Sequence, residues 1–292
     1  MYTILSFFAG VIGAVTVMQC GQMAAFHGDY SSSVVTHVVG LLAAMIAFSG
    51  KAKSLPEKKP VAPWMFLGGV IGVGTVVLNN MAFAGVGVTA IVGLGLLGQS
   101  VTSLVIDQFG LLGAQRNPFR KSRLLGIACV FAGALVMVFP LTGANIGAVL
   151  MALTTGLTIV VARTMNAQLA ARYGVVRSTV MNYITGLTTS AVVLILLGRS
   201  EPMMTDFRLS PNWFMYTAGA LGVVMTVILN VTVSRIPAFM FTMLQFTGQM
   251  FASLALDAIL QGSFSVQSAA GGILVAAGLA LNTYMDNKHK AA

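Results

Sequence analysis

The chain has 292 residues, of which 57% are hydrophobic and only 8% are charged. Soluble domains carry roughly 25% charged residues, so this composition excludes a soluble fold and predicts an integral membrane protein. The formal net charge of +9 does not indicate nucleic-acid binding, because the basic residues lie in short connections between apolar runs.

Apolar runs of about 20 residues, the length that crosses a bilayer, recur along the whole chain. They predict an all-α polytopic membrane protein with ten transmembrane helices, short connections and no soluble domain. The expected spans are 2–22, 32–49, 64–84, 88–107, 123–142, 145–168, 177–198, 212–233, 237–257 and 267–285.

The distribution of Lys and Arg predicts the orientation, because cytoplasmic loops carry an excess of both. The side that holds both chain ends has thirteen of them, and the other side has Arg199 and Arg208. Both termini are therefore expected in the cytoplasm. The thirteen are Lys51, Lys53, Lys58, Lys59, Arg116, Arg120, Lys121, Arg123, Arg172, Arg177, Arg235, Lys288 and Lys290.

The chain contains an internal duplication. Gly98–Asp107 and Gly248–Asp257 both read G-Q-x-x-x-S-x-x-x-D at an offset of 150 residues, and the outer helices match more weakly at offsets of 146 and 145. The two copies, 1–143 and 144–292, hold five predicted helices each. Because five is odd, the second copy is expected to enter the membrane inverted. Inverted repeats are typical of secondary transporters, with the substrate site near the midplane between the repeats.

Several residues carry a resemblance to a known family: Gly98–Ser103, Ile106–Gly113, Asn166, Gly174, Ser178 and Gly186. With the five-plus-five arrangement, they resemble the EamA-like drug/metabolite transporter (DMT) superfamily, and within it the YdcZ-type family, with two five-helix units fused. The resemblance implies export or exchange of small organic solutes across the bacterial inner membrane. The first copy has Cys20 where the second has Asn166, and the second lacks the Phe109–Gly113 tail, so the halves are not expected to do identical jobs.

Polar side chains within the spans are the candidate substrate-binding residues. Gln99 lies eleven residues into its span, with Gln249 as its counterpart; at 1.5 Å per residue this is about 16 Å, near the midplane. Glutamine offers donors and an acceptor without a charge to desolvate. For Gln99 and Gln249, and likewise for Asn80 and Asn230, the alternative is a hydrogen bond between helices. The other candidate substrate-binding residues are Asn80, Asn230, Asn166, Gln19 and Gln22.

Three charged residues are candidates for gating or proton coupling: Asp107, Asp257 and Arg163. Each Asp ends its helix, where a negative charge opposes the helix dipole. The alternative for both is a solvated residue at a helix end. Arg163 would favour an anionic group on the substrate if it faced the cavity, or its side chain would snorkel to the interface. The residues expected to compensate the aspartates are Arg116, Arg120, Lys121 and Arg123 for Asp107, and Arg199 and Arg208 for Asp257.

These features predict a secondary active transporter of a small organic metabolite or drug, working by alternating access. No phosphate-binding loop motif is present, so the driving force is expected to be a gradient. A flippase for a lipid or lipid-linked metabolite is the alternative, and it predicts a laterally open groove lined by Phe and Met.

We expect no enzyme activity, because the spans contain no Glu and no convincing nucleophile–base pair. No cofactor or metal site is predicted either, since Cys20, Cys129 and the three histidines are scattered. The expected partners are a small-molecule substrate and the lipid bilayer but no nucleic acid, with the protein a monomer or a homodimer.

Overall fold

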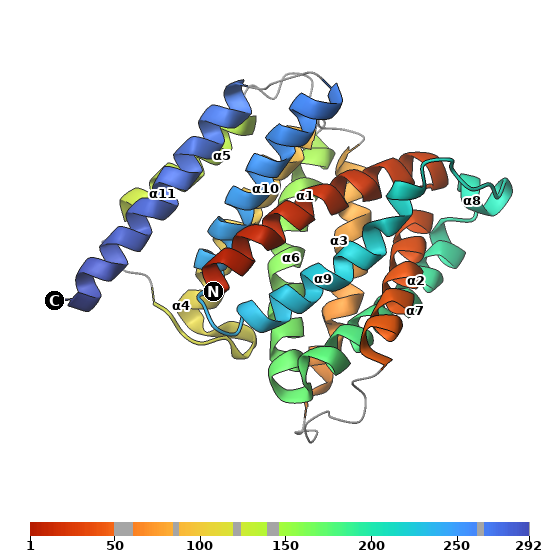
Figure 1. Cartoon of the computed structure of the whole chain (residues 1–292), viewed down its shortest axis with the longest axis horizontal. Coiled ribbons are helices and arrows are strands. Elements are labelled where there is room, and N and C mark those ends of the chain that lie inside the picture. The colour runs from red at the N-terminus through yellow and green to blue at the C-terminus, as the bar shows by residue number, and fades with distance from the viewer. Residues whose placement is uncertain (50–60, 84–87, 119–123, 139–145, 262–265, 292) are drawn as a thin grey trace.

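The computed structural model describes residues 1–49, 61–83, 88–118, 124–138, 146–261 and 266–291, and its regular elements in these ranges are helices (Figure 1). Four short helical segments accompany the long ones: η2 (Pro63–Leu67), η3 (Leu111–Gly113), α8 (Pro202–Thr205) and η5 (Trp213–Thr217). The long helices are α1 (Tyr2–His27), α2 (Asp29–Phe48), α3 (Gly68–Phe83), α4 (Val88–Phe109), α5 (Leu124–Val138), α6 (Ile146–Tyr173), α7 (Val175–Leu197), α9 (Ala218–Thr232), α10 (Ala238–Gln261) and α11 (Val266–Ala291).

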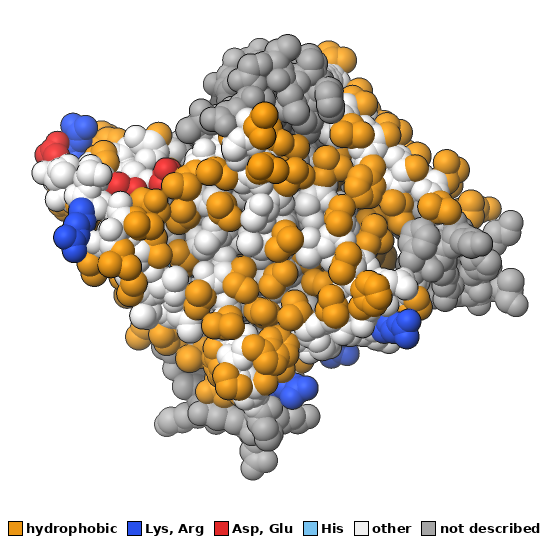
Figure 2. Space-filling view, turned by 180° about the vertical axis from the view of Figure 1, so that it is seen from behind, with side chains coloured by type: hydrophobic (Ala, Val, Ile, Leu, Met, Phe, Trp, Pro, Cys, Tyr) orange, Lys and Arg blue, Asp and Glu red, His pale blue; other side chains and the backbone are white. Residues whose placement is uncertain are grey.

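Eight helical segments in the described part are long and apolar enough to cross a membrane, and they correspond to predicted spans one to four and six to nine. In α5 and α11 the apolar stretches are shorter, Leu124–Val136 and Ala269–Gly278. Large apolar side chains face outward; Ile46 and Ile146 are each 77% exposed. Figure 2 shows hydrophobic side chains across the middle of one face and charged ones near its rim. Such an extended apolar surface suits contact with lipid.

Helices α1 and α6 are longer than predicted, because the residues expected to form loops after 22 and 168 are helical up to His27 and Tyr173. Each helix then turns into the next at a single glycine, Gly28 with φ 105° and Gly174 with φ 88°. Glycine adopts positive φ without a Cβ clash, so one residue is enough to reverse the chain. The prediction of longer loops was wrong at both places.

The two halves of the chain pack closely against each other. The most extensive contacts join α5 to α11, α1 to α10, and both α3 and α4 to α6. Glycines allow several of these close approaches. Gly10 and Gly248 bring the main chains of α1 and α10 together, and Gly98 and Gly156 do the same for α4 and α6. Since Gly10 matches Gly156 and Gly98 matches Gly248 in the duplication, the same helix contact is built twice.

A large apolar cluster joins α4, α5, α10 and α11. Leu96, Met243, Met250 and Val275 are almost completely buried in it. It holds the α5–α11 pair, seen at one side of Figure 1, against α4 and α10. The rest of α4 and α10 faces α6 and α1, and the buried polar residues gather there.

Candidate functional site

A central cavity lies between α1, α3, α4, α6, α9 and α10. Its first lobe has a volume of about 210 Å³ and is lined by Asn80, Gln99 and Gln249, among others. We call it the amide lobe. The second, the arginine lobe, has a volume of about 150 Å³ and is lined by Arg163, Asn166 and Asn230, among others. The two lobes adjoin, since both are lined by Thr75, Ile159, Met225 and Gln245.

The structure thus brings five of the seven predicted substrate-binding residues to one cavity. The other two, Gln19 and Gln22, lie elsewhere and join α1 to the segment before α9. The fully buried Gln19 donates through Nε2 to the main-chain oxygen of Phe214 (2.9 Å) and to Thr217 Oγ1 (2.7 Å). Gln22 Oε1 accepts from Asn212 Nδ2 (3.1 Å).

The paired asparagines make equivalent hydrogen bonds in the two copies. Asn80 Nδ2 donates to Ser32 Oγ (3.1 Å), and Asn230 Nδ2 donates to Ser178 Oγ (3.0 Å). Ser32 and Ser178 are themselves counterparts in the duplication. Each amide nitrogen therefore ties two helices together. The Oδ1 atom of Asn230 is buried without a hydrogen-bond partner, so it remains able to accept a hydrogen bond.

Arg163 is buried in the interior, with 4% of its surface exposed, so it does not snorkel to the interface. From α6 its guanidinium reaches between α4 and α10, and its carbon Cζ lies 5.0 Å from the centre of the Phe241 ring. The Nε atom is buried without a hydrogen-bond partner. The other nitrogens donate to neutral oxygens: Nη1 to Gln99 Oε1 (3.4 Å) and Gln245 Oε1 (3.3 Å), and Nη2 to Ser103 Oγ (3.0 Å), the Ala238 main-chain oxygen (3.5 Å) and Thr242 Oγ1.

Gln245, which lines both lobes and accepts from Arg163, was not among the predicted site residues. Its counterpart at an offset of 150 is Gly95, so a search for polar residues present in both copies passes over it. The same search does not find Thr242, because its counterpart is Val92. The two copies therefore contribute unequally to the site.

Asp107 is also buried, with 4% of its surface exposed, and it is not the solvated helix-end residue considered as the alternative. Its carboxylate accepts from the main-chain nitrogens of Ala238 (3.0 Å) and Phe239 (2.9 Å), the first residues of α10. The positive end of the α10 dipole thus compensates the charge. The carboxylate also interacts favourably with the Arg163 guanidinium through space.

Three of the arginines expected near the two aspartates make contacts that the structure describes, and Arg116 lines a cavity together with Asp107. Arg116 donates through Nε to the main-chain oxygen of Gln108 (3.1 Å). Arg199 donates to the main-chain oxygen of Ile195 (2.7 Å), and Arg208 lies 3.9 Å from Asp206. Outside the described part of the structure lie the side chain of Asp257 and residues Arg120, Lys121 and Arg123.

The contacts between α4 and α10 form a polar seam. It consists of the carboxylate cap made by Asp107, the hydrogen bond between Ser103 Oγ and Thr242 Oγ1 (2.8 Å), and the Arg163 guanidinium. Along α4, Gln99 lines the central cavity, Ser103 lies one turn further, and Asp107 lies one turn beyond that. The seam therefore lies at one end of the central cavity along α4.

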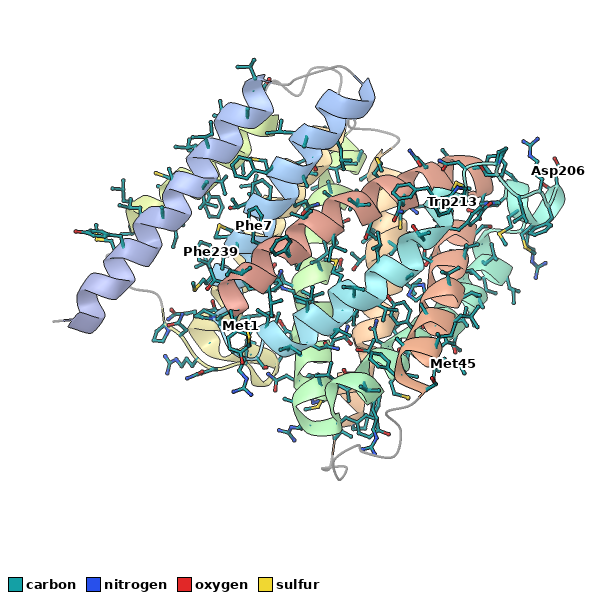
Figure 3. The ribbon with its side chains drawn as sticks, viewed as in Figure 1. Met1, Phe7, Met45, Asp206, Trp213 and Phe239 are labelled. Atoms are coloured by element: carbon teal, nitrogen blue, oxygen red, sulfur yellow. The ribbon has the colours of Figure 1, made fainter. Side chains whose placement is uncertain are left out.

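A second cavity of about 410 Å³, the vestibule, lies beyond the seam. Asp107, Arg116, Gln168 and Arg235 are among its lining residues. Figure 3 shows Phe239, at the seam, far from Asp206 and Trp213 at the other end of the molecule. Along α4, the seam residue Ser103 thus lies between Gln99 of the central cavity and Asp107 of the vestibule.

Comparison with known proteins agrees with the resemblance seen in the sequence. The family described as "Putative inner membrane exporter, YdcZ" of the DMT superfamily matches twice, over residues 1–136 and 147–281. A solved structure described as "Crystal structure of protein" is 16% identical, with 98% of each chain covered and a TM-score of 0.74, and it shows the fold. No curated protein matches the sequence. With two family matches that span nearly its whole length, the chain belongs to the YdcZ family of inner membrane exporters, a multi-pass transporter family of the DMT superfamily.

Proposed function

We propose that the protein is a secondary active transporter that moves a small organic metabolite or drug across the inner membrane by alternating access. The two copies, 1–143 and 144–292, would be five-helix units of inverted topology, with ten helices crossing the membrane and the substrate held between the units. The observation that carries this proposal is the central cavity, which residues of both copies line and which has the seam at one end.

The excess of Lys and Arg puts both termini in the cytoplasm. This orientation puts the seam and the vestibule on the cytoplasmic side of the central cavity. Asp107 and Arg163 then act as gating residues, because α4 and α10 must separate at the seam before a solute passes between cavity and vestibule. Because Asp107 already accepts two main-chain hydrogen bonds, gating explains its position better than proton carriage.

The lining of the central cavity favours a solute over a lipid chain. Its described residues include one methionine, Met225, and no phenylalanine, whereas amides come from both copies. A pocket for a drug-sized ligand has a volume of roughly 300–1,000 Å³, and the two lobes together lie near the lower end of that range. The lining therefore suits a small solute with several polar groups.

A thermal-stability screen of the purified protein against several hundred metabolites tests this function. A solute at about 100 times its Kd should stabilise the protein by about 2.7 kcal/mol. We expect the effect of a genuine substrate to disappear in Gln99→Ala and Gln249→Ala and to persist in Gln22→Ala, a control outside the cavity. Stabilisation by lipids alone would contradict the proposal and support the flippase.

A further inference from the structure

We infer that the transported solute is an organic carboxylate, and that its carboxylate opens the seam by taking the hydrogen-bond donors with which Arg163 holds α4 and α10 together. This inference rests on the proposed function and names its substrate class.

Two of the three guanidinium nitrogens of Arg163, Nε and Nη1, make long hydrogen bonds or none in the structure. Its Nε–H has no partner, and the Nη1 bonds to Gln99 and Gln245 are long, at 3.4 and 3.3 Å, against roughly 2.9–3.0 Å for a typical N–H···O bond. All five acceptors are neutral oxygens. A carboxylate forms shorter bonds to guanidinium, about twice as strong as neutral ones, and often binds two nitrogens at once. A carboxylate in the arginine lobe would therefore replace weak partners with a strong one.

A second unsatisfied atom belongs to Asn230, another residue that lines the arginine lobe. Asn230 Oδ1 is buried without a partner, while the amide nitrogen of Asn230 is held by Ser178 and Thr179. A buried acceptor without a hydrogen bond is destabilising. An occupant with a hydroxyl or amino group near its carboxylate would satisfy both Asn230 and Arg163. The lobe is complementary to that combination of groups.

The charges around the seam are compatible with an anion. Asp107 is the one acidic residue among the described lining of the vestibule, which also contains Arg116 and Arg235. Its carboxylate is directed to the start of α10, so the two arginines leave the vestibule with a net positive charge that attracts anions. A cytoplasmic excess of arginine is expected in any membrane protein, so this charge is supporting evidence only. The inference itself depends on Arg163.

Arg163 links recognition to opening because it bonds to both walls of the seam. It donates to Gln99 and Ser103 on α4 and to Thr242, Gln245 and the Ala238 oxygen on α10. A ligand shifts a conformational equilibrium only as far as it binds one state better than the other. A carboxylate that engages Arg163 removes bonds that exist only while the seam is closed, and so favours separation of α4 and α10.

The test compares carboxylates with their neutral amides: lactate with lactamide, mandelate with mandelamide, and benzoate with benzamide. Binding is measured by thermal stabilisation and titration calorimetry. The proteins are wild type, Arg163→Gln, Arg163→Lys and Arg172→Gln, the last replacing an exposed arginine on the same helix. At least one carboxylate should bind wild type tenfold more tightly than its amide. Arg163→Gln should lose that preference, Arg163→Lys should keep part of it, and Arg172→Gln should keep it all.

A second measurement follows the seam itself. Spin labels at Gln115→Cys and Ser234→Cys, two exposed positions lining the vestibule, report the distance between its walls when Cys20 and Cys129 are replaced by alanine. The bound carboxylate should add a longer distance in wild type but not in Arg163→Gln.

Equal affinity for carboxylate and amide, or a carboxylate affinity that Arg163→Gln and Arg163→Lys leave unchanged, would overturn the inference. If neutral or cationic metabolites stabilise the protein and the carboxylates do not, the proposed transport function is retained. The inference that the substrate is a carboxylate is then wrong. Stabilisation by lipids alone would remove the proposed function, and the inference with it.

Discussion

Gly98→Ala is expected to lower the free energy of unfolding by roughly 3 kcal/mol, the upper end of the usual cost of overpacking. A Cβ at Gly98 would overlap the main-chain oxygen of Leu153, and a Cβ at Gly156 would overlap that of Gly95. Main-chain atoms inside helices cannot move aside as a flexible side chain can. The two helices would have to separate along α4 and α6, which form one wall of the central cavity.

The duplication extends this prediction to the equivalent crossing of α1 and α10, and Gly74 provides a control. Gly10→Ala and Gly248→Ala should have similar costs, because they hold the equivalent crossing of α1 and α10. Gly74→Ala should cost nothing, since a Cβ there meets no atom within 4 Å. The free energy of unfolding of each variant is measured in mixed micelles. Equal stability of Gly98→Ala and Gly74→Ala would show that α4 and α6 do not cross this closely.

Asp107→Ala should lower the free energy of unfolding by roughly 3 kcal/mol. The variant leaves the Ala238 and Phe239 N–H groups buried without their acceptors, and each such group costs roughly 1–3 kcal/mol. It also removes the negative charge nearest the positive end of α10 and Arg163. Asp107→Asn keeps one acceptor oxygen and should lose about half as much.

Asp206→Asn is the matched control for the loss of a carboxylate. Asp206 is 76% exposed and 3.9 Å from Arg208, and exposed ion pairs contribute roughly 0–1 kcal/mol. The same unfolding measurement should barely distinguish it from wild type. An Asp107→Ala variant as stable as Asp206→Asn would mean that the cap on α10 contributes little to the seam.

Much of the helical fold could be predicted because apolar runs and helix lengths are local properties. The single-residue turns at Gly28 and Gly174 were missed because spans that end at 22 and 168 leave loops of several residues. The duplication led to Gln99, Gln249, Asn80 and Asn230, which the structure brings to the central cavity. It could not lead to Gln245, since Gly95 stands in the other copy.

The environment of the charged residues depends on contacts between distant parts of the chain. Arg163 could have snorkelled, and its partners Gln99 and Gln245 are 64 and 82 residues away. The sequence suggested side chains as compensation for Asp107, and the start of α10 adds two main-chain N–H groups. Pro237 immediately before Ala238 is a signal for that helix start, but the sequence does not say which carboxylate will lie beside it.

A reversible cross-link across the seam tests alternating access most directly. Ser103→Cys with Thr242→Cys, in a chain with Cys20 and Cys129 replaced by alanine, places two thiols where the hydroxyl oxygens are 2.8 Å apart. The measurement is transport, in proteoliposomes, of the solute found by the stability screen. Oxidation should stop transport and reduction should restore it, and oxidation should not change the transport rate of either single-cysteine variant. Transport at the full rate by cross-linked protein would contradict the account, because α4 and α10 would not need to separate.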